Sequence, residues 1–156
     1  MRIGVDLVRV SRIENAFRRW GDRFLNRIFT PAEIKACSGC SRQGEPQKAT
    51  GGSWGSDDDK RPELKPDPRR LAGRFAAKEA VLKAVGIGLR YSKWLEMEIL
   101  NDRLGKPKLT CRGALLKIME DMGVTDLDLS ISHTDEFAMA GVILIVGGHV
   151  RADEDR

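Results

Sequence analysis

The sequence predicts a small α+β domain, in which helices pack against a mostly antiparallel sheet. Apolar residues alternate with other residues over 2–8, 94–100 and 126–132, a period that is typical of strands. Segments with helical periodicity lie before and between these strands, an order that favours α+β packing. The 156 residues, of which 41% are hydrophobic and 32% charged, fit one globular domain.

The chain should begin with a strand and a helix. In the strand, Asp6 shares one face with Gly4 and Val8. Ser11 is followed three residues later by a glutamate, a capping box that predicts a helix start. Arginines cover most of this helix, and its apolar stripe consists of Ile13, Phe17, Trp20 and Phe24.

The later elements follow from the same patterns. Pro31 should be the first helical residue of a short helix that begins in Thr30–Glu33. Gly86 should stop a longer helix over residues 69–85. The remaining predictions are a strand at 108–111, a helix at 113–123 and a strand at 137–146.

Residues 38–70 differ in composition from the rest of the chain. They contain four of the six prolines, a run of three aspartates and few large apolar side chains. Such a segment buries too little surface to offset its ordering entropy. We predict a flexible insertion at about 38–70 within a single domain over 1–150, followed by a polar tail at 151–156.

Composition also limits partners and compartment. The net charge of +4 permits an acidic partner, and no apolar run reaches the length of a membrane span. The strand pattern starts at the first residues, so we expect no secretory signal. Three cysteines argue for a reducing compartment, and we interpret Cys37 and Cys40 as two plain thiols because no second pair or nearby histidine completes a zinc site.

Two carboxylates are the main candidates for chemistry. Glu79 lies on one helix strip with Phe75 and Lys83, and alanines run beside that strip. The simple interpretations are a surface Glu79–Lys83 ion pair and an Asp6 on a solvated sheet face. If the alanines bring this helix close to another element, Glu79 becomes half-buried and needs a cation. Two carboxylates on different elements suit Mg²⁺, which completes its shell with water and phosphate oxygens.

Cationic and polar side chains could meet a phosphate or a partner. The candidates for phosphate are Arg74, Lys78, Lys83 and Lys106, with Ser132 and His133 at the end of a strand. The arginines of the first helix, Arg12, Arg18, Arg19 and Arg23, form either a solvated face or a docking surface for an acidic helix.

Four motifs occur in one order along the chain: "GVDLV" at 4–8, "GRFAAKEAVLKAVG" at 73–86, "GKP" at 105–107 and "SISH" at 130–133. Together they resemble the holo-[acyl-carrier-protein] synthases, the small class of 4′-phosphopantetheinyl transferases. The resemblance covers nearly the whole chain outside 38–70 and the tail. It implies that family's fold and the transfer of phosphopantetheine from coenzyme A to a serine of an apo-acyl carrier protein, with Mg²⁺ as cofactor and adenosine 3′,5′-bisphosphate as second product.

The resemblance also implies roles for residues. Asp6 and Glu79 would bind the metal, and Lys83 would lie near the transferred phosphate. Arg74 and His133 would contact the nucleotide. The first helix would dock the acidic carrier protein of fatty-acid or polyketide synthesis. Bacterial members are typically homotrimers that bind the coenzyme between subunits.

The chemistry agrees with these roles, because charge neutralisation and positioning dominate phosphoryl transfer. Glu79 and a metal-bound water are both candidates for the general base. Arg9 is a departure, since many family members carry an acidic residue there. Two alternatives are a basic, non-catalytic adaptor for an acidic protein or nucleic acid, and a lineage that has lost activity. We expect neither nucleic acid nor membrane as a partner, and a cytoplasmic location, or a mitochondrial one in a eukaryote.

Overall fold

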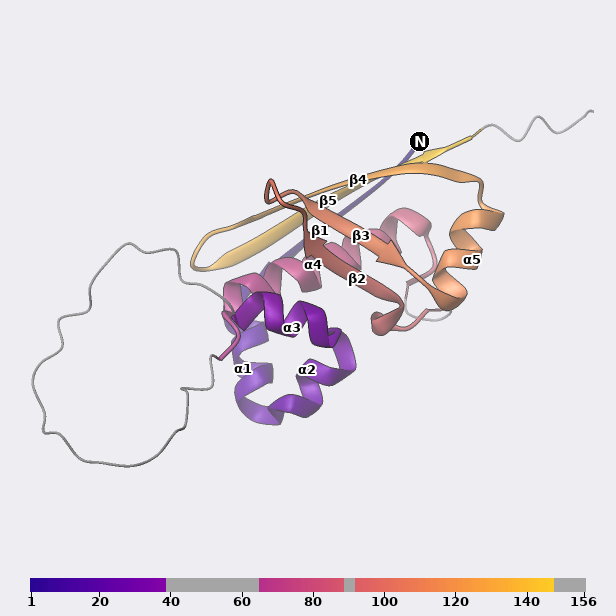
Figure 1. Ribbon diagram of the computed structural model, residues 1–156. Coiled ribbons are helices and arrows are strands. Elements are labelled where there is room, and N and C mark those ends of the chain that lie inside the picture. The colour runs from indigo at the N-terminus through magenta and orange to yellow at the C-terminus, as the bar shows by residue number, and fades with distance from the viewer. Residues whose placement is uncertain (39–64, 89–91, 148–156) are drawn as a thin grey trace, which may run out of the picture.

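A computed structural model describes residues 1–38, 65–88 and 92–147 and confirms the α+β class (Figure 1). No helix in these ranges is both long and apolar enough to cross a membrane. The elements in chain order are β1 (Arg2–Arg9), α1 (Val10–Trp20), α2 (Asp22–Ile28), α3 (Pro31–Ser38), α4 (Pro68–Val85), η2 (Trp94–Glu96), β2 (Met97–Asn101), β3 (Pro107–Cys111), α5 (Gly113–Asp121), β4 (Val124–His133) and β5 (Phe137–Val146).

The main sheet is antiparallel, with the strand order β1-β5-β4. Its register places Asp6 beside Ala140, which lies beside Ile131 on the next strand. The β2–β3 hairpin forms a separate antiparallel pair. In Figure 1, α4 runs beneath the main sheet, α1–α3 lie at one end of it and α5 lies at the other.

Helix α4 covers the inner face of the main sheet at close range. Ala72, Ala76 and Ala80 are fully buried, as the alanine pattern predicts. On β1, Gly4 has no room for a side chain, since a Cβ there would lie 1.9 Å from the Ala80 carbonyl oxygen. The small residues therefore bring β1 and α4 close enough for their polar side chains to meet.

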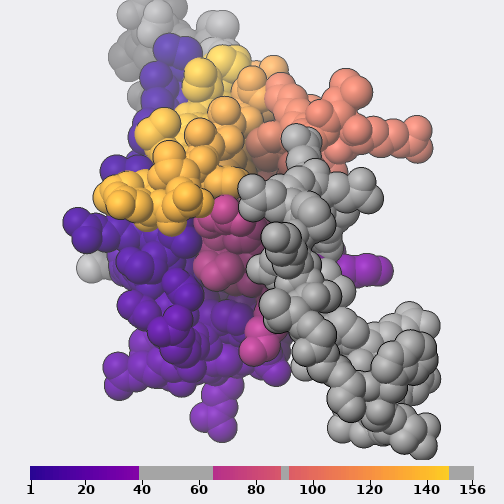
Figure 2. All heavy atoms as spheres, turned by 90° about the vertical axis from the view of Figure 1, so that its left-hand side faces the viewer, coloured from indigo at the N-terminus to yellow at the C-terminus, as the bar shows by residue number. Residues whose placement is uncertain are grey.

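The ends of α4 are well defined. Asp67 caps its first turn by accepting a hydrogen bond from the Arg69 amide, and Gly86 ends it in the left-handed conformation with φ 86°. Figure 2 shows part of this helix (magenta) at the surface between the N-terminal helices (indigo) and the β4–β5 hairpin (orange to yellow).

The first helix differs from its prediction. The capping box of Ser11 is absent, because α1 already starts at Val10, whose amide donates to the Glu136 carbonyl. The single helix predicted through Phe24 is two helices, since Gly21 adopts a φ of 53° between α1 and α2. Trp20 at this break is 53% exposed and does not belong to the core.

The bounds of other helices and strands differ from the predicted bounds by a few residues. Trp94–Glu96 form a 3-10 turn in place of the first residues of the predicted strand. Helix α4 starts within the proposed insertion, so residues 65–70 lie next to or in an ordered helix. Most of that insertion, and the tail at 151–156, lie outside the described residues.

The outer face of the main sheet is apolar and exposed. It carries the odd-numbered residues of β1 and β5, which point away from α4. Six large apolar residues among them are between 41% and 61% exposed, and we call these six the outer apolar face: Ile3, Val5, Leu7, Met139, Ile143 and Ile145.

Candidate functional site

The candidate site lies where β1 meets α4. Lys83 on α4 donates a 2.7 Å hydrogen bond from Nζ to Asp6 Oδ1, and another of 3.1 Å to the Val5 carbonyl. The Asp6 side chain is only 15% exposed, whereas Lys83 is 53% exposed. Strand alternation turns Asp6 inward, and the adjacent alanines of α4 let Lys83 reach it.

Glu79 lies one helical turn before Lys83 and is half-buried. Burial raises the pKa of Glu79, and the neighbouring negative charge of Asp6 raises it further. Lys83 and Arg12 act in the opposite direction and lower this pKa. The structure therefore brings two carboxylates and two cations together, as predicted for all of them except Arg12.

This donor set fits a divalent cation. Two carboxylates that repel each other at a half-buried edge favour a positive ion between them. The described ranges contain no cluster of three or more acidic, histidine or cysteine side chains. A pair of carboxylates is nevertheless enough for Mg²⁺, because this ion keeps several waters and binds substrate phosphates.

Lys78 and Arg74 lie inside the protein. Lys78 has no exposed side-chain surface and pairs with Glu33 at 2.7 Å. Burial lowers the pKa of Lys78, and Glu33 opposes that change. The prediction that Lys78 contacts phosphate is wrong, because its ammonium group is enclosed and already bonded. Arg74 is 8% exposed and donates to the Ile99 carbonyl and to Asn101 Oδ1, so its main role in the structure is to join α4 to β2.

The other predicted ligand residues lie away from Asp6 within one chain. His133 and Ser132 are exposed at the end of β4, and β5 lies between that strand and β1. Two strand spacings of about 4.8 Å separate β4 from β1. Lys106 instead pairs with Asp128 at 2.8 Å, which raises the pKa of Lys106.

Arg9 lies on the opposite sheet face from Asp6. Its guanidinium sits 5.6 Å from the centre of the Phe137 ring, in a cation–π contact. Residues three apart on a strand point to opposite faces, which explains the separation. Arg9 therefore does not contact the carboxylate pair.

The arginines of the predicted docking surface are exposed on α1 and α2. Arg18 is 73% exposed and pairs with Glu14 at 2.8 Å. Arg19 lies over the Trp20 ring, and Arg23 follows on α2. Arg12 begins this surface, and its positive charge lowers the pKa of Glu79, so the arginines begin within electrostatic range of the candidate site.

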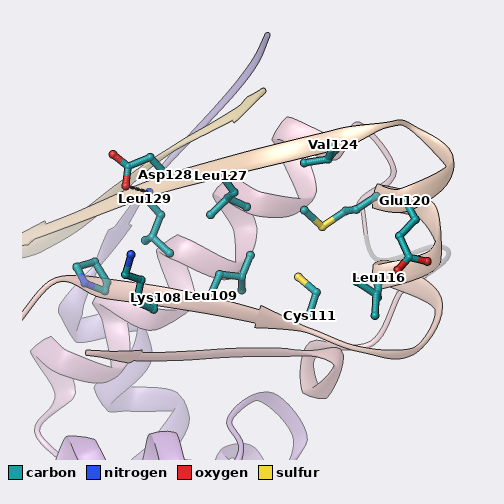
Figure 3. Close-up of a pocket in the computed structure, with 11 residues that line it drawn as sticks. Lys108, Leu109, Cys111, Leu116, Glu120, Val124, Leu127, Asp128 and Leu129 are labelled. Carbon is teal, nitrogen blue, oxygen red and sulfur yellow. Dashed lines mark hydrogen bonds between the residues drawn. The ribbon is translucent and has the colours of Figure 1, made fainter. Parts of the chain in front are cut away.

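A pocket of about 270 Å³ lies elsewhere, between β3, α5 and β4 (Figure 3). Most of its wall is apolar, and Leu109, Cys111 and Met119 contribute to it. Burial raises the pKa of Cys111 to about 11, so its thiol stays protonated. None of the predicted site residues lines this pocket.

Glu33 is a core residue that the sequence patterns did not predict. Its side chain accepts a 2.8 Å hydrogen bond from the Thr30 amide, and the Thr30 hydroxyl accepts one from the Glu33 amide. This reciprocal arrangement is a capping box. The sequence signal for this capping box was a threonine followed three residues later by a glutamate.

The chain is similar to known proteins over most of its length. Residues 2–140 match the 4′-phosphopantetheinyl transferase superfamily. A holo-[acyl-carrier-protein] synthase of Koribacter versatilis is 36% identical over 142 residues, covering 90% of this chain and 94% of that protein. One of Solidesulfovibrio magneticus is 40% identical over 144 residues, covering 91% and 95%.

Solved structures give the same result. The Helicobacter pylori holo-[acyl-carrier-protein] synthase in complex with coenzyme A has a TM-score of 0.68 and 28% identity, covering 92% of this chain and 99% of that one. The fold, the motif order and these relatives agree over most of the sequence. The chain therefore belongs to the 4′-phosphopantetheinyl transferase superfamily and, within it, to the holo-[acyl-carrier-protein] synthases.

Proposed function

We propose that this protein transfers 4′-phosphopantetheine from coenzyme A to a serine of an apo-acyl carrier protein. The observation that carries the proposal is the meeting of Asp6, Glu79 and Lys83 at the β1–α4 contact in a chain of this family. A non-catalytic adaptor offers no reason to hold two carboxylates together at a half-buried site.

The reaction exchanges one phosphorus–oxygen bond for another. The serine oxygen of the carrier attacks the β-phosphorus of coenzyme A, and the bond from that phosphorus to the bridging oxygen breaks. Adenosine 3′,5′-bisphosphate leaves, and the serine proton passes to a base, for which Glu79 or a water are the candidates. Lys83, half exposed beside Asp6, can turn toward the transferred phosphate and neutralise its charge.

Asp6 and Glu79 are the residues that would hold Mg²⁺. When bound, this ion supplies Lewis-acid stabilisation and orients the pyrophosphate. The protein contributes two hard oxygen donors, fixed on a strand and a helix whose separation is set by small residues. Arg12, next to Glu79, is a further cation available to an anionic substrate.

The arginine surface of α1 and α2 supports docking of the carrier protein. Arg12, Arg18, Arg19 and Arg23 are all exposed. An acidic helix of a carrier would meet this surface with complementary charge. Because Arg12 also neighbours Glu79, a carrier bound here would present its serine close to the carboxylates.

The protein is proposed to assemble as a homotrimer in the cytoplasm, and the outer apolar face supports the association of subunits. Six large apolar residues are exposed on one sheet face, a pattern that marks interaction surfaces. His133 and Ser132 lie two strands away from Asp6 within one chain, and the proposal is that these residues reach the coenzyme from a neighbouring subunit. The coenzyme would then bind between subunits.

Mass spectrometry tests the activity directly. The purified protein is incubated with an apo-acyl carrier protein and coenzyme A, with Mg²⁺ or with EDTA. We expect the carrier to gain the mass of phosphopantetheine only when Mg²⁺ is present. A carrier that keeps its original mass under all conditions would refute the proposed function, and full modification in EDTA would refute the role of the metal.

A further inference from the structure

Lys78 is the most completely enclosed cation in the described part of the chain. Its Nζ donates hydrogen bonds to the Ile28 carbonyl (2.7 Å), to Glu33 Oε2 (2.7 Å) and to the Trp94 carbonyl (3.1 Å). A protonated lysine has three N–H donors, so all of them are used. The three acceptors come from the end of α2, from α3 and from η2.

Glu33 extends this network in the other direction. Its Oε1 accepts a 3.0 Å hydrogen bond from the Ile99 amide on β2, and its Oε2 accepts one of 2.8 Å from the Thr30 amide. Like Lys78, Glu33 has no exposed side-chain surface. The ion pair therefore ties α4 to the α2–α3 connection and to β2 inside the core.

The polar contacts between α4 and β1 are less enclosed than those of Lys78. Lys83, which is 53% exposed, donates to Asp6 and to the Val5 carbonyl, and Arg2 donates to the Val85 carbonyl at the end of α4. The rest of this contact consists of alanine methyl groups and the backbone at Gly4, which set the distance between helix and strand but do little to fix the rotation or the height of the helix. Hydrogen bonds are directional, and those of Lys78 point to three separate elements.

We infer that the buried Lys78–Glu33 pair positions Glu79 by holding α4 at the rotation and height at which Glu79 meets Asp6. Lys78 and Glu79 are adjacent, about 100° apart around the helix axis, so the two side chains move together. The inference rests on the proposed function, since Glu79 is assigned to the reaction there. Lys78 is a positioning residue, because it is enclosed and touches no substrate.

The substitution Lys78→Met tests this role, since it keeps an unbranched side chain and removes the ammonium group. We expect kcat to fall about 100-fold, as for a displacement of about 1 Å in a catalytic group. The KM for coenzyme A should change little, because the exposed cations remain. The control is Met119→Ala, a core truncation in α5 between β3 and β4, which should leave kcat close to wild type at a temperature where both variants are folded.

A crystal structure of Lys78→Met adds a measurement that needs no activity. We expect Glu79 to be displaced relative to Asp6, and Glu33→Gln provides the same test with a smaller change if Lys78→Met does not fold. The inference is overturned by an unchanged kcat in the folded variant, by an equal loss in Met119→Ala, or by an unmoved Glu79. A wild-type protein that transfers nothing refutes the proposed function instead, and the crystal structure then still decides whether Lys78 positions Glu79.

Discussion

Lys83 crosses from α4 to β1 and donates a 2.7 Å hydrogen bond to the carboxylate of Asp6. This ion pair joins the "GVDLV" motif to the "GRFAAKEAVLKAVG" motif, and its two partners are 77 positions apart in the sequence. Glu79 lies beside it with a raised pKa, caused by burial and by Asp6. The contact thus unites the proposed metal ligands with the proposed phosphate partner.

Neutralising either carboxylate should abolish transfer. In Asp6→Asn and Glu79→Gln we expect kcat to fall by about 100-fold or more, because a preorganised charged group is lost where phosphate charge develops. The gain of mass on the carrier protein measures the rate. The matched control is Asp121→Asn, since Asp121 is an exposed carboxylate at the end of α5 and has no role in the proposed site. Normal turnover by either site variant contradicts the assignment.

Glu79→Gln should also increase stability while it removes activity. The pKa of Glu79 is raised in the folded protein, so the folded state binds more protons than the unfolded state at a pH between the two pKa values. The free energy of unfolding therefore falls as pH rises through this window, and the full penalty is present at neutral pH. Because Glu79 is partly exposed, we expect a gain below about 1 kcal/mol.

Urea unfolding in EDTA measures this difference. The advantage of Glu79→Gln should be present at pH 7 and should shrink on acidification, as the wild-type carboxylate becomes protonated in both states. A variant that is less stable than wild type at neutral pH would show that the Glu79 carboxylate is well compensated in the metal-free protein.

The sequence was sufficient to predict that Asp6, Glu79 and Lys83 lie together, because their signals are local. Strand alternation turned Asp6 inward, and helical spacing aligned Glu79 with Lys83 beside the alanines. The close approach of α4 and β1 was predicted from those alanines, and the burial of Ala80 confirms it. Glycine at position 4 completes this contact from the strand side.

Long-range partners explain what the sequence could not show. The sequence predicted Lys78 as a phosphate ligand, because nothing local pointed to Glu33, its partner in the core, which is 45 positions away. The predicted cap at Ser11 failed because the amide of Val10 bonds to Glu136 at the other end of the chain. Such pairings depend on how elements pack, which no local pattern records.

Charge reversal on the arginine surface should weaken carrier binding. In Arg18→Glu and Arg23→Glu we expect the KM for carrier protein to rise more than the KM for coenzyme A, since these residues lie on α1 and α2 away from the carboxylates. Arg103→Glu, an exposed charge reversal at the turn of the β2–β3 hairpin, is the control. Equal effects on both KM values would argue against docking through α1 and α2.

A charge on the outer apolar face should prevent assembly. Val5 lies at the centre of that face, 51% exposed and paired with Gly141. In a trimer, Val5→Glu would bury an unpaired carboxylate, which is strongly unfavourable. We expect a monomer by light scattering and a large loss of transfer. Leu104→Glu is the control because Leu104 is 94% exposed on a turn, and a fully active Val5→Glu monomer would contradict a site shared between subunits.

Gly4→Ala should disrupt the contact on which the site depends. The added Cβ would lie 1.9 Å from the Ala80 carbonyl oxygen and 2.7 Å from the Ala84 amide nitrogen, both backbone atoms of α4. Overpacking usually costs about 1–3 kcal/mol, and we expect at least the upper end of that range because backbone atoms cannot rotate away. If the variant folds, α4 must move from β1, so transfer should also fall.

Gly73→Ala is the matched control, since Gly73 lies in the same helix. Its Cβ would meet Ile131 Cγ2 at 2.8 Å, the end of a side chain that can shift. The helix gains about 1 kcal/mol when alanine replaces glycine, which offsets the cost of this adjustment. Urea unfolding measures the free energy of unfolding of both variants and so compares the contact at Gly4 with the contact at Gly73. If Gly4→Ala loses no more stability than Gly73→Ala, the close contact of β1 and α4 does not depend on the small residue at position 4.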